Sequence, residues 1–360
     1  MTMKRRNDFF YFKEDFLNNS ENFAAAKGIH DVDYCLERTL KDKYINKESV
    51  SSIEVEGKSK LDKVFYYFSM HKLRLLYSLS RIHDKNIFLQ YPFYKGKIFD
   101  HIMKNMMKKN QVFLIVHDVD SIRMESVNEK EEIDILNLAH GLILMQGKNM
   151  KNWLINHGVQ VKHILTMDIY DYIVPDFIPS ERHLTNEIAF AGNLRKSSFL
   201  DQLNKLKKPF KLNLYGPFYE DRQKALVLNQ NVRYWGNYSA IELLTELKGS
   251  FGLIWDGNSI DTENGKYGKY NRYNIPFKFP MYIVSGMPII CWKDSGIADF
   301  VRKHNLGLCI NSLNDINEVV SAVTPEQYQR MRIRVLDLRK KLMTGELMAN
   351  AIQEAIDLWK

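Results

Sequence analysis

The sequence predicts an α/β protein made of two Rossmann-like domains. Short apolar runs bounded by polar residues recur along the chain, and most are followed by a segment of helical period. This alternation is typical of parallel sheets covered by helices. A stretch with two prolines over residues 173–182 separates two sets of elements, and 360 residues suit about two domains. We expect domains at 1–172 and 186–345.

The first set contains five predicted strands and the helices between them. Apolar runs predict strands at residues 8–12, 86–89, 111–116, 141–145 and 161–165. Helical periods predict helices at 23–39, 99–109 and 150–157. Strands in this order with intervening helices favour a parallel sheet.

The second set repeats the pattern after the proline-containing linker. Its predicted strands are 187–191, 212–215, 232–235, 251–255, 287–292 and 306–310. Its predicted helices are 197–207, 239–247, 279–285 and 296–304. Two more helices, 325–343 and 346–359, are separated at Thr344 and Gly345, and we expect the segment 346–360 to pack back on the first domain. Ligands of such sheets bind at the carboxyl ends of the strands.

The chain carries a net charge of +8 and has a pI near 9.0. This favours an anionic partner, which could be a nucleotide phosphate, a lipid headgroup or nucleic acid. The aromatic residues follow strand and helix periods and are not interleaved with basic residues, which argues against nucleic acid. No apolar run is long enough to span a bilayer, so membrane contact would be peripheral. Basic residues at 104–109 and 205–211 could provide it, or they could simply be solvated faces.

Cysteine usage favours a reducing compartment. Cys35, Cys291 and Cys309 are odd in number and far apart in the sequence, so they form neither a disulfide framework nor a CxxC site. Charges interrupt the apolar residues near the N-terminus, which therefore does not resemble a signal peptide. We expect a cytoplasmic protein.

Several motifs of other enzyme classes are missing. The sequence has no GxSxG, no Walker GxxxxGK[ST] and no GxGxxG. It therefore lacks the signature motifs of α/β-hydrolases, P-loop nucleotide-binding proteins and dinucleotide-binding proteins. No third metal ligand stands at a useful spacing from His117 and Asp118. We expect no metal ion and no cofactor.

Two segments of the second set are candidates for phosphate binding. Gly192 and Asn193 follow a strand, and Arg195 and Lys196 precede a helix, so basic side chains and free amides could hold a diphosphate. A tight turn with a solvated basic pair is the alternative. Lys278 stands in the first turn of a predicted helix, where the helix dipole disfavours a cation, and an anion nearby would explain it. Alternatively, Lys278 is simply an exposed lysine that tolerates the unfavourable interaction with the helix dipole.

Asp256 ends the strand 251–255, and a polar loop over 258–273 follows it. The loop is too long to serve only as a connection and could be a lid, a substrate loop or a flexible insertion. In the first set, His117 and Asp118 end the strand 111–116. Either could act as the general base toward an acceptor hydroxyl, with Asp118 the first choice, or could cap the next helix.

The run over residues 251–301, which begins FGLIWDG and contains NIPFKF and IADF, closely resembles a bacterial family of GT-B glycosyltransferases. The family includes β-1,6-galactofuranosyltransferases of O-antigen assembly and streptococcal glucosyltransferases that extend glycans on serine-rich-repeat adhesins. Further segments resemble the same family, at 11–27, 88–94, 115–123, 191–197 and 342–357.

The resemblance implies two domains facing each other across a cleft, the first binding a glycan acceptor and the second a UDP-sugar. It places Arg195 at the diphosphate, Tyr238 near the uridine, and Lys278 with Asn274 and Pro276 at a phosphate contact. In the wider GT-B pattern a glutamate ahead of the Gly-x-Pro turn holds the ribose, but residues 280–284 offer Met and Tyr instead.

The function implied is a metal-independent, inverting transfer of galactofuranose or glucose from a UDP-sugar to a saccharide, a lipid-linked glycan or a glycoprotein. A homo-oligomer is implied as well. The alternatives are an inactive GT-B scaffold that partners another transferase, and a sugar-nucleotide epimerase, which would need the missing dinucleotide fingerprint.

Overall fold

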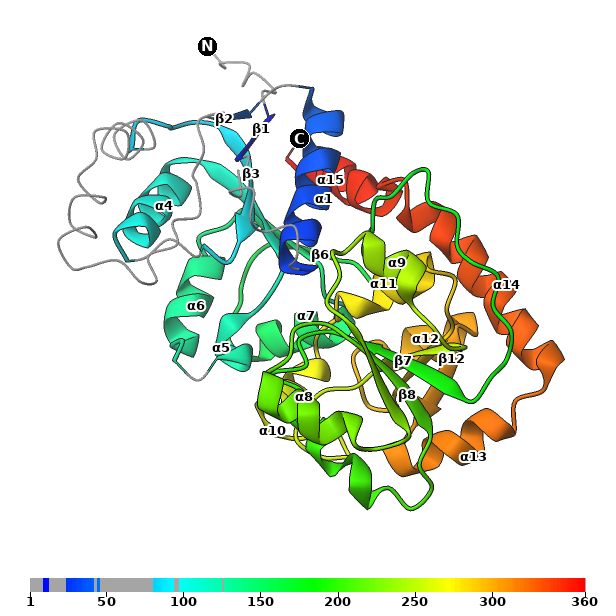
Figure 1. Cartoon of the computed structure of the whole chain (residues 1–360). Helices are drawn as coiled ribbons and strands as arrows, with labels where there is room; N and C mark the ends of the chain where they lie inside the picture. Colours follow the sequence, from blue (N-terminus) through cyan, green and yellow to red (C-terminus); the bar gives the residue numbers. More distant parts are fainter. Residues whose placement is uncertain are drawn as a thin grey trace, which may run out of the picture.

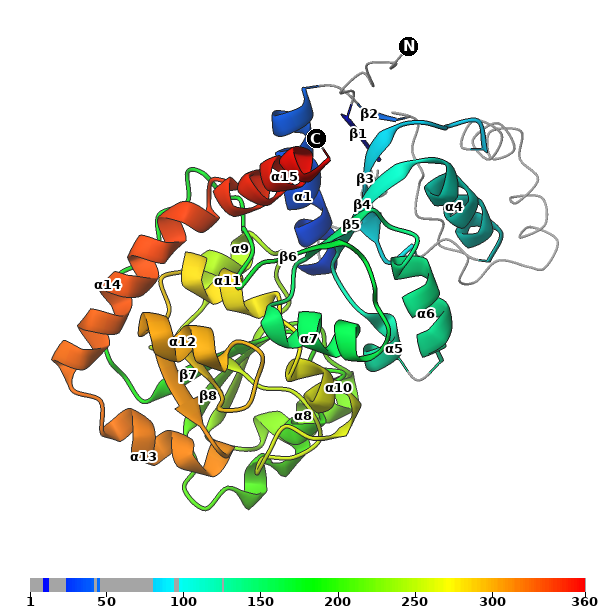
Figure 2. The same cartoon turned by 180° about the vertical axis from the view of Figure 1, so that it is seen from behind.

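The described part of the chain folds into two parallel sheets of six strands each, with helices around them (Figures 1 and 2). A computed structural model describes residues 9–12, 24–41, 44–45, 80–93, 97–124 and 126–359. The two sheets use separate halves of the chain, which confirms the predicted α/β class.

The N-terminal sheet has the strand order β2-β1-β3-β4-β5-β6. Its strands are β1 (Phe9–Phe12), β2 (Tyr44–Ile45), β3 (Asn86–Tyr91), β4 (Gln111–Val116), β5 (Gly141–Leu144) and β6 (His163–Thr166). The described helices beside them are α1 (Ala24–Leu40), α4 (Lys97–Lys109), α5 (Asp120–Arg123), α6 (Glu129–Leu136) and α7 (Lys148–Asn156). The central strands β3 and β4 pair over six positions and are buried after their first residue, as their apolar runs require.

The C-terminal sheet has the order β12-β11-β10-β7-β8-β9. Its strands are β7 (Glu187–Ala191), β8 (Lys211–Tyr215), β9 (Val232–Gly236), β10 (Phe251–Ile254), β11 (Ile289–Trp292) and β12 (Gly307–Ile310). Its helices are α8 (Glu220–Val227), α9 (Glu242–Glu246), α10 (Gly265–Asn271), α11 (Lys278–Val284), α12 (Ala298–His304) and α13 (Ile316–Ser321). The strand order reverses between β7 and β10, and ligands of open α/β sheets bind at such a switch point.

The last two helices return the chain to the N-terminal sheet. After α14 (Pro325–Leu342), α15 (Glu346–Leu358) lies beside α1 (Figure 1). Asp171 accepts hydrogen bonds from the amides of Leu347 and Met348, which start α15. Trp359 then packs edge-on against Phe88 and Phe113 of the N-terminal sheet.

The structure adds elements that the periodicity missed. The strand β2 and the helices α5, α6, α8, α10 and α13 were not predicted. These elements are short, and brief runs give little periodic signal. The helix predicted at 197–207 is a 3₁₀ helix, Ser198–Lys205. Some predicted positions lie outside the described residues. They are residue 8 of the first predicted strand, residue 23 of the first predicted helix, residues 13–23 of the segment 11–27, and residues 94 and 360.

Two of the three cysteines are neighbours in space. Cys291 and Cys309 are paired residues of β11 and β12, and their sulfur atoms lie 3.7 Å apart as free thiols. Their distance in the sequence concealed this, because a crossover connection separates adjacent parallel strands. No helix in the described part of the chain is long and apolar enough to cross a membrane.

Candidate active site

Gly192, Asp256 and Lys278 meet where β7 and β10 end. The Nζ of Lys278 lies 3.7 Å from an Asp256 carboxylate oxygen and donates to the Trp255 carbonyl at 3.3 Å. A side chain at Gly192 would place its Cβ 3.8 Å from the same Nζ. The structure therefore brings these three predicted residues together at the switch point of the C-terminal sheet.

The turn after β7 is held by its own polar groups. The Oδ1 of Asn193 accepts the Arg195 amide at 3.1 Å, and the Asn193 carbonyl accepts from the Ser197 hydroxyl. Arg195 is exposed, and its guanidinium lies 5.1 Å from the ring centre of Tyr219. The turn thus carries an exposed cation shortly after β7, and the place of Arg195 at a diphosphate stays a prediction.

Arg222, which the sequence analysis missed, braces this turn from α8. Its guanidinium donates to the carbonyls of Leu194 and Ser197 and pairs with Asp201 at 2.6 Å. No local motif marks Arg222, since its partners lie more than 20 residues away in the chain.

Asn274 and Pro276 shape the chain that leads into α11. The Asn274 amide donates to the Tyr270 carbonyl at 3.0 Å, and the carbonyl of the buried Pro276 accepts the Phe279 amide at 2.8 Å. Between them, the Ile275 carbonyl accepts from the Tyr170 hydroxyl of the interdomain segment. These residues therefore place Lys278 while tying its helix to the N-terminal half.

Tyr238 follows β9, at the same edge of the sheet. Its hydroxyl donates to the Trp235 carbonyl at 3.0 Å, and its ring centre lies 6.3 Å from that of Tyr215. Neither contact joins it to Lys278, so its part in uridine binding remains a prediction.

The polar loop 258–273 is folded around a buried carboxyl group. Glu263 is 2% exposed and accepts hydrogen bonds from the Asp256 amide at 2.9 Å and the Asn271 side chain at 2.7 Å. Burial raises the pKa of Glu263 to about 8. The loop also contains α10, so it has a defined structure that starts beside Asp256.

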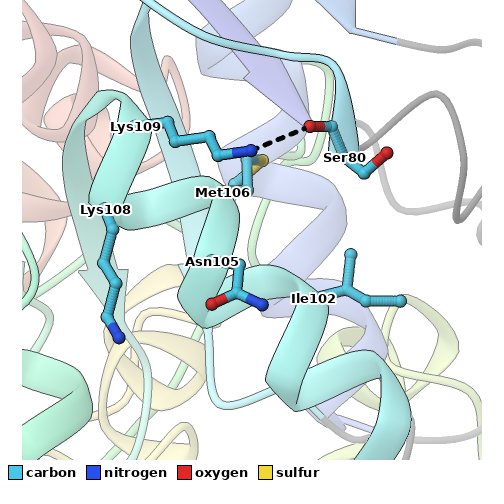
Figure 3. A pocket seen from close by; sticks show the side chains of 6 residues that line it. All are labelled: Ser80, Ile102, Asn105, Met106, Lys108 and Lys109. Atoms are coloured by element: carbon cyan, nitrogen blue, oxygen red, sulfur yellow. Dashed lines mark hydrogen bonds between the residues drawn. The ribbon is translucent and has the colours of Figure 1, made fainter.

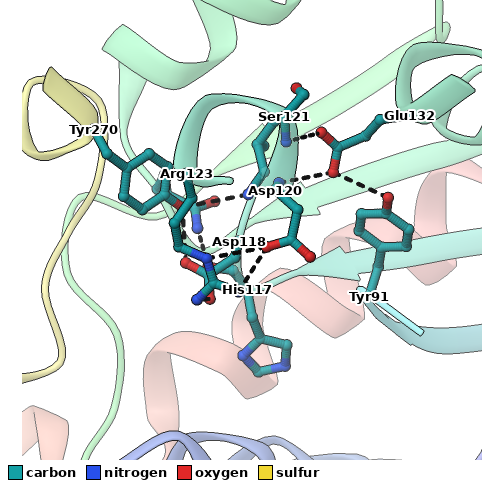
Figure 4. Close-up of polar contacts among 10 residues, drawn as sticks. Tyr91, His117, Asp118, Asp120, Ser121, Arg123, Glu132 and Tyr270 are labelled. Atoms are coloured by element: carbon teal, nitrogen blue, oxygen red, sulfur yellow. Dashed lines mark hydrogen bonds and ion pairs between the residues drawn. The ribbon is translucent and has the colours of Figure 1, made fainter. Parts of the chain in front are cut away.

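Asp118 meets this loop from the N-terminal domain (Figure 4). One carboxylate oxygen accepts from the Tyr270 hydroxyl of α10 at 2.7 Å, and the other pairs with Arg123 at 2.6 Å. Burial raises the pKa of Asp118 to about 6, although the Arg123 charge opposes the shift. The contact joins the carboxyl end of β4 to the C-terminal domain.

Neither His117 nor Asp118 caps the helix that follows. Val119 occupies the N-cap position of α5 and makes no side-chain cap. The first amides of α5, from Asp120 and Ser121, instead donate to the buried carboxylate of Glu132 (Figure 4). The capping alternative for His117 and Asp118 is therefore wrong, because Glu132 fulfils that role.

The imidazole of His117 points away from the Asp118 cluster (Figure 4). Its Nε2 lies 2.6 Å from the Oε1 of Gln90 on β3, and the side chain of Gln146 donates to its backbone carbonyl. The surrounding protein lowers the pKa of His117 to about 4, since burial disfavours the charged ring. His117 is accordingly neutral at pH 7.

A separate hollow of about 220 Å³ lies at the other end of the N-terminal sheet (Figure 3). Residues of α4 and Ser80 line it, and the Lys109 amine donates to the Ser80 carbonyl at 3.4 Å. Lys108 and Lys109 are exposed and precede the amino end of β4, whereas His117 follows its carboxyl end. The hollow is therefore not part of the candidate site. Within the described residues, no group of three or more His, Cys, Asp or Glu could hold a metal ion.

Two doubly wound sheets with candidate residues at their strand ends define the GT-B class of glycosyltransferase folds. A solved structure of Anabaena HepE with UDP-glucose superposes with a TM-score of 0.62 at 9% identity, over 97% of this chain and 99% of that one. This likeness concerns the fold.

The sequence comparisons identify the family. Residues 53–169 match the N-terminal domain and residues 188–355 the C-terminal domain of the glucosyltransferase 3-like family, and the chain belongs to that family. It is 25% identical to the β-1,6-galactofuranosyltransferase WbbI of Escherichia coli K12, over 78% of this chain and 82% of WbbI. It is 27% identical to glucosyltransferase 3 of Streptococcus gordonii, over 75% of this chain and 78% of that protein.

Proposed function

We propose that the protein transfers a hexose, galactofuranose or glucose, from a UDP-sugar to a glycan acceptor in the synthesis of a cell-surface polysaccharide or glycoprotein. The names of the two curated relatives supply these sugars, and the HepE complex supplies the nucleotide. The observation that carries the proposal is the Lys278 amine beside Asp256 and Gly192 at the switch point of the C-terminal sheet. A fixed cation there suits the phosphates of a nucleotide.

In the proposed reaction the acceptor hydroxyl attacks the anomeric carbon of the sugar. The bond from that carbon to the UDP oxygen breaks, and its electron pair leaves with UDP. Lys278 and Arg195 would stabilise the negative charge that develops on the leaving group, so that no metal ion is required. The hydroxyl proton passes to a base on the opposite face of the sugar, which gives inversion.

The geometry favours His117 over Asp118 as that base, the reverse of the order inferred from the sequence. Both oxygens of Asp118 already accept hydrogen bonds, from Tyr270 and Arg123. His117 is neutral at pH 7, and among the described residues its Nδ1 has no hydrogen-bond partner. Each Asp118 oxygen keeps a second lone pair, but its contacts hold that carboxylate at Tyr270 and Arg123, whereas the Nδ1 lone pair of His117 accepts no hydrogen bond from a described residue.

Two further proposals concern partners. The exposed Lys108 and Lys109 support peripheral contact with an anionic membrane surface, where lipid-linked acceptors would be found. A homo-oligomer remains a proposal based on the family resemblance alone.

Thermal unfolding with a panel of nucleotides and nucleotide sugars tests the proposed donor. A ligand that binds only the folded state raises the Tm, and we expect this for UDP and one UDP-sugar, with or without magnesium. Lys278→Ala should abolish most of the shift, because the variant loses the cation at the phosphates.

The matched control is Lys303→Ala, which removes an exposed lysine at the end of α12 and should keep the full shift. Equal shifts for wild type and Lys278→Ala would remove Lys278 from the phosphate site. If no nucleotide raised the Tm of the wild type, the inactive scaffold would become the better interpretation.

A further inference from the structure

A chain of buried polar groups lies behind His117. Gln90 on β3 is 3% exposed and Asp33 on α1 is 4% exposed. Gln90 lies in the family-like segment 88–94, where no role was predicted for it, and Asp33 lies in no predicted motif. The Nε2 of Gln90 donates to the Oδ1 of Asp33 at 2.8 Å and to the Ile29 carbonyl at 3.4 Å. Its Oε1 lies 2.6 Å from the Nε2 of His117. Buried amides and carboxylates are costly unless they are paired, so these contacts define the arrangement.

The partners of Gln90 determine which way its amide points. A backbone carbonyl such as that of Ile29 can only accept, and a carboxylate such as Asp33 also accepts. The amide nitrogen of Gln90 must therefore face these two groups, and its oxygen must face His117. An amide oxygen cannot donate, so the proton in the contact belongs to the Nε2 of His117.

We propose that Gln90 and Asp33 are positioning residues that hold His117 as the Nε2–H tautomer, with Nδ1 unprotonated and ready to take the acceptor's proton. The proposal rests on the transferase function stated above. Asp33 orients Gln90, and Gln90 orients the ring. In the proposed reaction the Nδ1 of that ring would face the acceptor hydroxyl. Asp118 and its partner Arg123, the charged residues drawn beside His117 in Figure 4, lie on the other side of the His117 backbone from its ring.

The tautomer can be observed without any substrate. In ¹⁵N-histidine-labelled protein at pH 7, protonated and unprotonated ring nitrogens give distinct NMR signals, and His117→Gln assigns those of His117. We expect a protonated Nε2 and an unprotonated Nδ1 in the wild type. A proton on Nδ1 would overturn the proposal, whatever reaction the protein catalyses.

Two variants test whether Gln90 determines the tautomer of His117. Gln90→Leu should give a mixture of both tautomers, because it removes the acceptor from Nε2. Gln146→Leu is the matched control, since this buried glutamine bonds the His117 backbone and not its ring, and it should keep the Nε2–H form. A single Nε2–H form in Gln90→Leu would overturn the role of Gln90.

Kinetics then connect the tautomer to turnover, with UDP release from the donor chosen by thermal shift and water as the acceptor. Gln90→Leu should lower kcat about 10- to 100-fold, within the roughly 10²–10⁴-fold contribution of a general base, and leave the donor KM unchanged. A wild-type kcat in this variant would contradict the proposal. Wild-type protein with the expected tautomer but no release from any UDP-sugar would instead contradict the proposed function.

The double variant Gln90→Glu with Asp33→Asn exchanges the two groups and keeps their total charge. The introduced carboxylate accepts from Nε2 and favours the protonated ring, so kcat should recover and the acidic limb of the pH profile should move to higher pH. A merely structural role predicts no such movement, and an unmoved limb would refute the positioning role.

Discussion

His117 and Asp118 are adjacent in the chain, yet their side chains enter different hydrogen-bond networks. Asp118 joins Arg123 and Tyr270, whereas His117 joins Gln90 and Asp33. Successive residues at a strand end point to opposite sides, so Asp118 faces the domain contact while the ring of His117 faces Gln90. The sequence shows both residues but not this division.

The two roles predict different losses of activity. His117→Gln should lower kcat by roughly 10²–10⁴-fold, as expected for removal of a general base, and should leave UDP binding unchanged. Asp118→Asn should have a smaller effect on kcat, because the amide still occupies the same place between Tyr270 and Arg123. Steady-state kinetics and calorimetric UDP titration measure both variants. A larger loss of kcat in Asp118→Asn would return the role of base to Asp118.

At the scale of elements, the loop 258–273 connects the two halves of the site. It starts beside Asp256, is anchored by the buried Glu263, and carries α10, whose Tyr270 bonds Asp118 and accepts the Val119 amide at 3.3 Å. The Tyr270 ring also packs in the core of the N-terminal sheet. A change in the loop can therefore reach both the proposed donor and acceptor sides.

Tyr270→Phe tests this connection. The variant keeps the ring but removes the hydroxyl, which leaves the Val119 amide and one Asp118 oxygen without their partner and should cost about 1–3 kcal/mol of stability. Hydrogen exchange in residues 258–273 should become faster. Tyr267→Phe on the same helix is the control and should exchange like the wild type. Unchanged exchange in Tyr270→Phe would show that the loop does not depend on this bond.

At the scale of the molecule, buried carboxyl groups make stability depend on pH. Burial raises the pKa of Asp171 to about 7 and that of Glu263 to about 8, from ordinary values of 3.8 and 4.5. At pH values between the ordinary pKa and the raised pKa of each group, the folded state binds more protons than the unfolded state. The free energy of unfolding therefore falls as the pH rises through this range. His117 changes stability in the opposite direction, because folding lowers its pKa from 6.5 to about 4. Its contribution raises the free energy of unfolding as the pH rises to 6.5 and is constant above that pH.

We therefore expect the free energy of unfolding to decrease from pH 6.5 to pH 8.5, as Asp171 and then Glu263 lose their protons. Urea denaturation at several pH values in this range measures the decrease. Glu263→Gln should reduce the slope, because the amide has no proton to lose, while Glu318→Gln at an exposed site should not. A flat wild-type profile would show that these carboxyl groups titrate at ordinary values.

The sequence by itself determined the α/β class, the strands of both sheets except β2, and the positions of Gly192 and Asp256 after strands and of Lys278 at a helix start. It did so because apolar runs and turn residues are local signals, and because strand ends gather at one edge of a parallel sheet. Only the tertiary structure decided that Tyr270 meets Asp118 across 152 residues and that Gln90 and Asp33 stand behind His117. Such partners come together through packing, and a hydrogen bond between distant residues leaves no periodic trace in the chain.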